Sequence, residues 1–318
     1  MPAQRTSGDC YRYCSKKPVR GFNQFRLRTA ADLTKKSSLI GGALALLMLV
    51  FPASSLAAPE TKKAGESKLK SIQLCNGADR SSPDQQIKGC TALIEAGKET
   101  GLILAIAHTN RGNAYTAKGD YDLAISDYDM AVKLNPSFSK PFNSRGVAFF
   151  KKGDYEGAIK DFDEAIKLQP DYAKAFANRA EAYQKRHDYQ RAARDYDEAI
   201  RLAPSLNALW NGRCWARAVL GQLQPALADC NRALTLRPND AATLDSRGFT
   251  YLKMGQFDSA IEDYNLALRS EPTMASALYG RGLARLKKGD TAGGNADVAA
   301  AQRVEAKIAD DFSYYGIR

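Results

Sequence analysis

The chain has 318 residues, of which 44% are hydrophobic and 25% charged, a balance typical of a globular protein rather than of a disordered or membrane-embedded one. Its formal net charge is +11, but residues 1–57 carry +7 of it, which leaves only +4 for the rest of the chain. A charge spread so thinly cannot neutralise a row of phosphates, so we expect no nucleic-acid partner.

Residues 1–57 have the pattern of an export signal. Lys35 and Lys36 precede an apolar run at residues 39–51, and small residues follow as far as Ala57. The run is shorter than the roughly 18 residues that favour a membrane span. We therefore expect cleavage after Ala57 and a periplasmic or secreted protein. The alternative is that residues 39–51 remain and anchor the chain to the inner membrane, which would be its only membrane contact.

A short linker and an irregular helix pair are expected next, at residues 58–68 and 69–104. In the second segment, Ile87, Cys90, Leu93 and Ile94 have the three- and four-residue spacing of one helix face. The same pattern returns at residues 125–132, so we interpret 69–104 as a degenerate first repeat.

Proline then recurs with a constant spacing of 34 residues, at positions 136, 170, 204, 238 and 272. A fixed period of 20 to 50 residues indicates a repeat array. It divides the chain into six units, at residues 105–138, 139–172, 173–206, 207–240, 241–274 and 275–308.

Each unit is expected to form two helices that pack closely. In the second unit Phe142, Gly146 and Phe149 share one face of a first helix, and Gly153 and Asp154 break the chain before a second helix. Small residues recur at equivalent positions, for example Gly112, Gly146, Ala180, Cys214, Gly248 and Gly282. They would let neighbouring helices approach, and one unit alone could not bury its apolar face, so the units must stack.

Two charged columns follow the same period. Arginines precede the small residues, at Arg111, Arg145, Arg179, Arg213, Arg247 and Arg281. Aspartates follow each arginine by sixteen residues, at Asp127, Asp161, Asp195, Asp229, Asp263 and Asp297. We favour a structural ladder of ion pairs between helices; the alternative is a row of ligand-binding arginines.

Four cysteines occupy matching positions in two helix pairs. Cys90 takes the position of Cys230, and Cys75 that of Cys214 if the turn is one residue shorter. Two disulfides, Cys75–Cys90 and Cys214–Cys230, are therefore expected in an exported chain, each worth roughly 3 kcal/mol in the chain-entropy model. Four buried free thiols are the alternative.

The sixth unit has Ala306 where a proline would stop its second helix, so residues 309–318 are expected to form a terminal cap through Phe312, Tyr314 and Tyr315. Catalytic and metal-binding patterns are missing. The two histidines, His108 and His187, have no cysteine or carboxylate partner at metal-ligand spacing, and no phosphate-binding or nucleophile motif occurs. We expect no enzyme, no cofactor and no metal, and we interpret His108 as a packing residue.

The repeated pattern resembles the tetratricopeptide repeat. The first unit carries Asn110, Arg111, Gly112, Ala114 and Tyr115, and the positions around Gly119, Ala124, Tyr128, Ala131 and Pro136 also agree. This resemblance covers all six units. It implies an all-α, right-handed solenoid of antiparallel helix pairs with a C-terminal capping helix. The segments at 75–79 and 308–312 further resemble exported tetratricopeptide proteins of soil alphaproteobacteria.

In that family the first helices line a concave groove that holds peptides. The resemblance assigns to the groove a polar end and an apolar end: Asn110, Asn113, Asn143 and Asn178, then Trp215, Phe249, Leu252, Tyr279 and Leu283. The alternative is that the apolar residues pack against neighbouring first helices or under the terminal helix.

We expect a scaffold that binds an unknown protein or peptide partner, as a peptide or helical segment in the groove, in the periplasm or cell envelope. One alternative is a non-catalytic binding subunit of a larger cell-envelope or secretion enzyme complex. An enzyme with an unrecognised site is a third.

Overall fold

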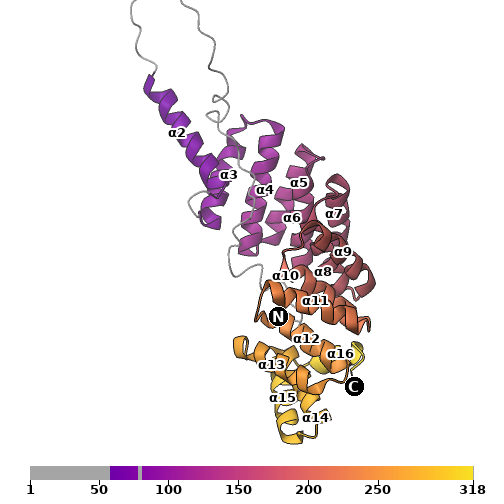
Figure 1. The fold of residues 1–318 in the computed structure, drawn as a ribbon. Coiled ribbons are helices and arrows are strands. Elements are labelled where there is room, and N and C mark those ends of the chain that lie inside the picture. The colour runs from indigo at the N-terminus through magenta and orange to yellow at the C-terminus, as the bar shows by residue number, and fades with distance from the viewer. Residues whose placement is uncertain (1–57, 78–80, 318) are drawn as a thin grey trace, which may run out of the picture. The chain divides into compact units, whose positions relative to one another are not determined.

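The structure, a computed structural model, describes residues 58–77 and 81–317. The expected export segment, with its apolar run and the cleavage site after Ala57, lies outside these residues. The described part of the chain contains fifteen α-helices and no strands (Figure 1), which confirms the all-α prediction. None of the described helices is both long and apolar enough to cross a membrane.

The described residues form two compact units, 58–153 and 154–317, which we treat separately. The first contains α2 (Ala58–Cys75), α3 (Pro83–Ala96), α4 (Gly101–Lys118), α5 (Tyr121–Leu134) and α6 (Ser139–Lys152). The second contains α7 (Tyr155–Leu168), α8 (Ala173–Lys185), α9 (Tyr189–Leu202), α10 (Asn207–Val219), α11 (Leu223–Leu236), α12 (Ala241–Lys253), α13 (Phe257–Ser270), α14 (Ala275–Lys287), α15 (Thr291–Val304) and α16 (Ile308–Tyr314).

Short turns close each helix pair, as the glycines in the sequence predict. Gly119, after α4, has a φ of 88°, in the left-handed region that glycine tolerates best. His187 replaces the glycine between α8 and α9 and still adopts a φ of 60°. The turn geometry is therefore kept even where the residue is unfavourable.

The small-residue positions have the packing role predicted for them. A Cβ atom added to Gly112 would lie 2.7 Å from the ring of Tyr128, which is closer than side-chain atoms approach. A second contact was not predicted. Tyr264 lies against Gly248 of its own repeat, where a Cβ would be 2.9 Å from its ring, and against Gly280 on the next first helix, where a Cβ would be 2.3 Å away. A tyrosine of the second helix thus wedges between two consecutive first helices.

The N-terminal boundary differs from the prediction. Residues 58–68, expected to be a linker, are instead the first part of α2. Alanine, lysine and glutamate in this segment favour a helix, and Pro59 lies in its first turn, where a missing N–H does no harm. The pair α2 and α3 accounts for most of the expected degenerate repeat, and α4 begins at Gly101, four residues ahead of the predicted unit.

Candidate functional site

The arginine and aspartate columns form ion pairs between the two helices of a repeat. In α8 and α9, Arg179 Nε and Nη2 each donate to a different carboxylate oxygen of Asp195, both at 2.7 Å. The same two-point contact joins Arg111 to Asp127, Arg213 to Asp229, Arg247 to Asp263 and Arg281 to Asp297. The aspartates of these pairs are buried.

A third polar column completes this ladder and was missed by the sequence analysis. Nη1 of Arg179 donates to Asp163 at 2.6 Å, on the second helix of the preceding repeat. Equivalent contacts reach Thr91, Asp129, Asp197, Asn231 and Asn265. From Asp129 onward these positions also recur every 34 residues, so the periodic signal was present. Three guanidinium nitrogens are engaged within the chain at Arg111, Arg179, Arg213, Arg247 and Arg281, so the geometry favours the structural interpretation over ligand binding.

Burial acts strongly on the ladder carboxylates. Desolvation raises the pKa of Asp195 and of Asp263 above the usual range. Burial would also raise the pKa of Asp127, but hydrogen bonds from Arg111 and His108 outweigh it and lower the value. His108 Nδ1 lies 2.8 Å from Asp127 Oδ1, so this histidine is a polar member of the ladder and more than a packing residue.

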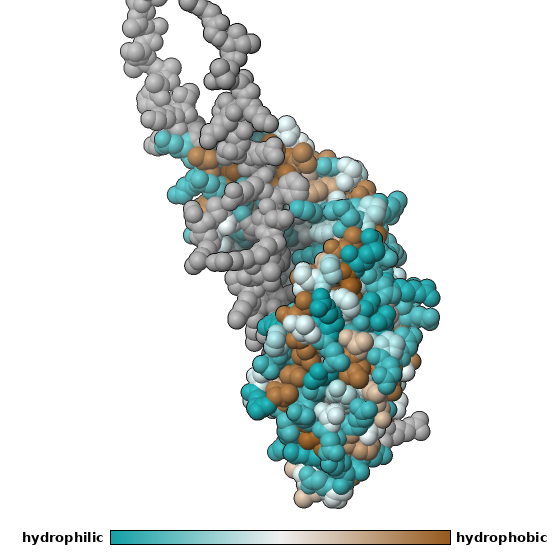
Figure 2. Space-filling model, in the orientation of Figure 1, coloured by the Kyte–Doolittle hydropathy of each residue, from teal (hydrophilic) through white to brown (hydrophobic). Residues whose placement is uncertain are grey.

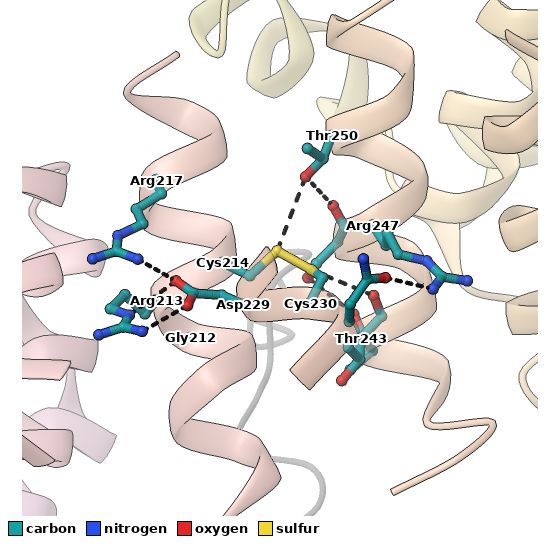
Figure 3. The surroundings of a disulfide bond; sticks show 12 residues. Gly212, Arg213, Cys214, Arg217, Asp229, Cys230, Thr243, Arg247 and Thr250 are labelled. Carbon is teal, nitrogen blue, oxygen red and sulfur yellow. Dashed lines mark hydrogen bonds and ion pairs between the residues drawn. A yellow bond between two sulfur atoms is a disulfide. The ribbon is translucent and has the colours of Figure 1, made fainter. Parts of the chain in front are cut away.

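The structure contains both predicted disulfides. Cys75 bonds to Cys90, with a Cα–Cα distance of 4.6 Å, and Cys214 bonds to Cys230, at 5.4 Å. All four cysteines are completely buried. Figure 3 shows the second bond linking α10 to α11, with Thr250 of α12 beside the Cys214 sulfur at 4.0 Å.

The asparagines assigned to the polar end of the groove expose little surface. Asn110, Asn143 and Asn178 are all buried. Asn110 Nδ2 donates to Asn76 Oδ1 at 3.4 Å, and Asn113, which is partly exposed, accepts a hydrogen bond from the Tyr128 hydroxyl at 2.8 Å. Of the four, only Asn113 is thus placed to meet a partner; burial of the others contradicts the prediction.

The apolar end is covered as well, by the end of the chain itself. Phe249 is 1% exposed and Leu252 is 6% exposed, while Trp215, Tyr279 and Leu283 are partly buried in the same cluster. The Phe312 ring lies 5.7 Å from the ring of Phe249 and 4.8 Å from that of Tyr279, measured between centroids. An open groove at these positions is therefore wrong, and the alternative interpretation, packing under the terminal helix, is correct.

The C-terminal segment, residues 308–317, does not simply extend the stack. A helix stacked after α15 would contact only α14 and α15. Instead the Tyr315 ring lies 5.2 Å from that of Trp215 on α10, and Tyr314 lies 4.5 Å from His187, before α9. The short helix α16 itself packs on α14 and α15 (Figure 1), and the rings of the segment reach farther back, to Phe249 of α12 and Trp215 of α10.

Lys253 supplies the polar contact of this surface. Its Nζ donates to the backbone oxygen of Tyr315 at 2.9 Å and to that of Val219, at the end of α10, at 3.2 Å. It also lies 5.6 Å from the centroid of Phe249. Burial lowers its pKa. We call Trp215, Phe249, Lys253 and Tyr279 together the aromatic surface.

One titratable group nearby has no role in the ladder. Burial raises the pKa of Asp245, on α12, to about 7, although Ser276 donates a hydrogen bond to it at 2.7 Å. The buried Tyr264 hydroxyl, whose pKa is also raised by burial, has no hydrogen-bond partner within the described residues. In that part of the chain no group of histidine, cysteine and acidic residues is arranged to hold a metal ion.

Large apolar side chains are also exposed elsewhere in the described part of the chain. Large exposed apolar side chains such as Leu123, Leu206 and Val304 come from different helices or turns. Figure 2 shows hydrophobic residues scattered in small groups among hydrophilic ones on the face it presents. Aromatic rings that contact one another, by contrast, gather where the C-terminal segment packs on α10, α12 and α14.

Profiles of known families match the repeats. A profile described as "TPR repeat" matches residues 146–187 and 248–289, and one described as "Tetratricopeptide repeat" matches residues 105–138 and 173–206. No curated protein sequence matches the chain.

Several solved structures share the fold. A tetratricopeptide repeat protein from Parabacteroides merdae has a TM-score of 0.60 at 18% identity, covering 79% of this chain and 100% of its own. A chain of the Cut9–Hcn1 APC/C hetero-tetramer has a TM-score of 0.61 at 16% identity, covering 77% of this chain and 48% of its own. Pseudomonas aeruginosa pilF has a TM-score of 0.56 at 15% identity, covering 66% and 96%. These identities establish a common solenoid fold and nothing finer. The matches to the two repeat profiles, together with the helix pairs and their small-residue contacts, show that the chain is a tetratricopeptide repeat protein.

Proposed function

We propose that the protein is a non-catalytic scaffold that binds a peptide or helical segment of a partner protein through the inner faces of its first helices. One observation carries this proposal. Trp215, Phe249 and Tyr279 stand on three consecutive first helices, and rings of one short chain segment pack against all three. Large aromatic residues that converge on one surface are the usual anchors of protein interfaces.

The two disulfides support a location outside the cytoplasm for this scaffold. Disulfides form and persist in oxidising compartments such as the bacterial periplasm. Both bonds are completely buried between helices, as expected of structural disulfides. The basic and apolar pattern of residues 1–57 supplies a route to that compartment. We therefore place the scaffold in the periplasm or cell envelope.

A capture experiment tests the binding surface. The full chain, produced with its own leader and an internal tag, is used to recover partners from envelope extract after cross-linking. Trp215→Ala/Tyr279→Ala should lose the proteins that the wild type recovers. Trp210→Ala is the matched control, because Trp210 is also on α10 but packs over Arg213 of the ladder. Equal recovery by all three, with equal helicity, would remove the aromatic surface from the proposal.

Fractionation tests the location. The four cysteines in the two disulfides should be protected from alkylation in the periplasmic fraction until a reductant and a denaturant are added together. Alkylation of all four in native, unreduced material would contradict both the disulfides and the export.

A further inference from the structure

The C-terminal segment occupies the surface that the proposed function assigns to a partner. Trp215 is two repeats, and His187 three repeats, before the last helix pair, yet both contact Tyr315 or Tyr314. A segment that only sealed the end of the stack would need neither contact. Ile308 and Phe312 are buried, whereas Ser313 and Tyr314 are exposed, so one face of the segment is inserted and the other faces solvent.

The contacts define what this surface selects. Phe312 and Tyr315 are three residues apart, which places both rings on one face of a helical turn. Phe312 lies between Phe249 and Tyr279, and Tyr315 lies against Trp215. Lys253 then binds the backbone oxygen of Tyr315, at the negative end of the short helix. The surface thus recognises two aromatic rings on one helical turn and the direction in which that helix runs.

The C-terminal segment has little stability of its own as a helix. Its helix spans only Ile308–Tyr314, and a helix of seven residues has almost no intrinsic stability in water. It is ordered by the aromatic surface, by contacts with α14 and α15, and by the rings of His187 and Tyr189. Exposing the rings of the aromatic surface to water is unfavourable, so the segment leaves only if another apolar group replaces it.

We propose that residues 308–317 are an intramolecular occupant of the partner-binding site, displaced by a partner segment of the same chemistry: a helical turn with two aromatic residues three positions apart, whose C-terminal carbonyls reach Lys253. This inference rests on the proposed function. A tethered occupant has an effective concentration of about a millimolar, so the wild type binds such a partner weakly until the partner outcompetes the segment.

The test uses the full chain and a labelled peptide of residues 305–318, titrated by fluorescence anisotropy. Phe312→Ala/Tyr315→Ala in the protein removes both rings and leaves Ile308 in place. This released variant should bind the peptide at least tenfold more tightly than the wild type. Ser313→Ala is the matched control, because Ser313 is exposed on the same helix, and it should bind as the wild type does. Adding Trp215→Ala to the released variant should abolish the gain.

Two outcomes overturn the inference. One is a released variant that keeps its helicity and melting behaviour but binds no better than the wild type. If that variant loses its fold, hydrogen exchange on the wild type decides: saturating peptide should speed exchange in residues 308–317 at least tenfold, and unchanged exchange shows a permanent cap. If the released variant binds the peptide no better than the wild type, but the wild type still captures partners from envelope extract through the aromatic surface, only the inference is wrong. If the peptide binds as expected but the wild type captures no partner through this surface, the proposed function is wrong.

Discussion

The two disulfide-bonded helix pairs have the same chemistry in very different surroundings. Cys75 and Cys90 join α2 to α3 beside a small buried cluster that contains Leu93, Ile106 and Ala107. Cys214 and Cys230 join α10 to α11 inside a much larger cluster, which reaches Phe249, Tyr264 and Phe312. The loops closed by the two bonds are nearly equal, with sequence separations of 15 and 16.

The difference in surrounding packing means that the two disulfides contribute differently to the order of their helix pairs. In the chain-entropy model, loops of this length give about the same stabilisation, near 3 kcal/mol. In a stack of repeats, however, each pair also gains stability from the repeats it touches. The α10–α11 pair has extensive apolar packing in its unit, while α2–α3 has little, so the same bond matters more for order at the first pair.

The largest effect is expected from Cys75→Ala/Cys90→Ala. Loss of about 3 kcal/mol of loop constraint should exceed what the small cluster supplies. Amides of α2 and α3 should then exchange with solvent orders of magnitude faster, while those of α12 and α14 stay protected. Hydrogen exchange followed by mass spectrometry measures both regions in one sample. Unchanged protection of α2 would show that the comparison between the two pairs is mistaken.

A smaller effect is expected from Cys214→Ala/Cys230→Ala. The large cluster should keep α10 and α11 folded, so the loss appears as a lower melting temperature, by about 6–12 °C, for a loss of about 3 kcal/mol in a chain of this size. Circular dichroism melts measure the shift, and the native helicity should not change. If the amides of α10 and α11 alone lose protection from hydrogen exchange, both disulfides are needed for the local order of their helix pairs.

The smallest effect is expected from Arg179→Ala, which removes a ladder rung away from both disulfides. Asp195 is buried and would lose its only partner in the ladder, so we expect the free energy of unfolding to fall by about 2 kcal/mol. The side chain of Arg179 is 18% exposed, which keeps this loss below that for a fully buried pair. Chemical denaturation measures it.

Arg201→Ala is the matched control for that prediction, since Arg201 is 63% exposed and pairs with Glu198 within one helix turn. It should give no measurable change. Partner capture should be unaffected by either substitution. A loss of capture with Arg179→Ala at unchanged stability would return the arginines to a ligand-binding role.

The repeat period made most of the fold predictable. Six copies of one pattern predicted the helix pairs and the ladder residues. The match of Cys75 and Cys90 to the positions of Cys214 and Cys230 predicted both disulfides. The third ladder column followed the same period but mixed aspartate and asparagine, so a search for a single residue type passed over it. Residues 58–68 have helical propensity but no repeat to compare with, and their helix was missed for that reason.

The candidate site was predictable only in part. The sequence identified Trp215, Phe249 and Tyr279 as residues of one surface, because they occupy first-helix positions. It could not decide what covers them. Phe312 and Tyr315 occur once each in a segment outside the period. Phe249 lies 63 residues before Phe312 in the sequence and Trp215 lies 100 residues before Tyr315, so only folding brings these rings together. The long-range packing of a single short segment does not produce a periodic pattern in the sequence.

The sharing of each ladder arginine between two repeats has a consequence for how such a chain can change its length. Arg213 binds Asp229 within its repeat and Asp197 in the preceding one. An insertion or deletion within the helices that carry them would turn one partner away from the other and leave a charge in the interior without its counter-ion. Gain or loss of entire units preserves every rung. The ladder therefore favours changes in length by whole repeats.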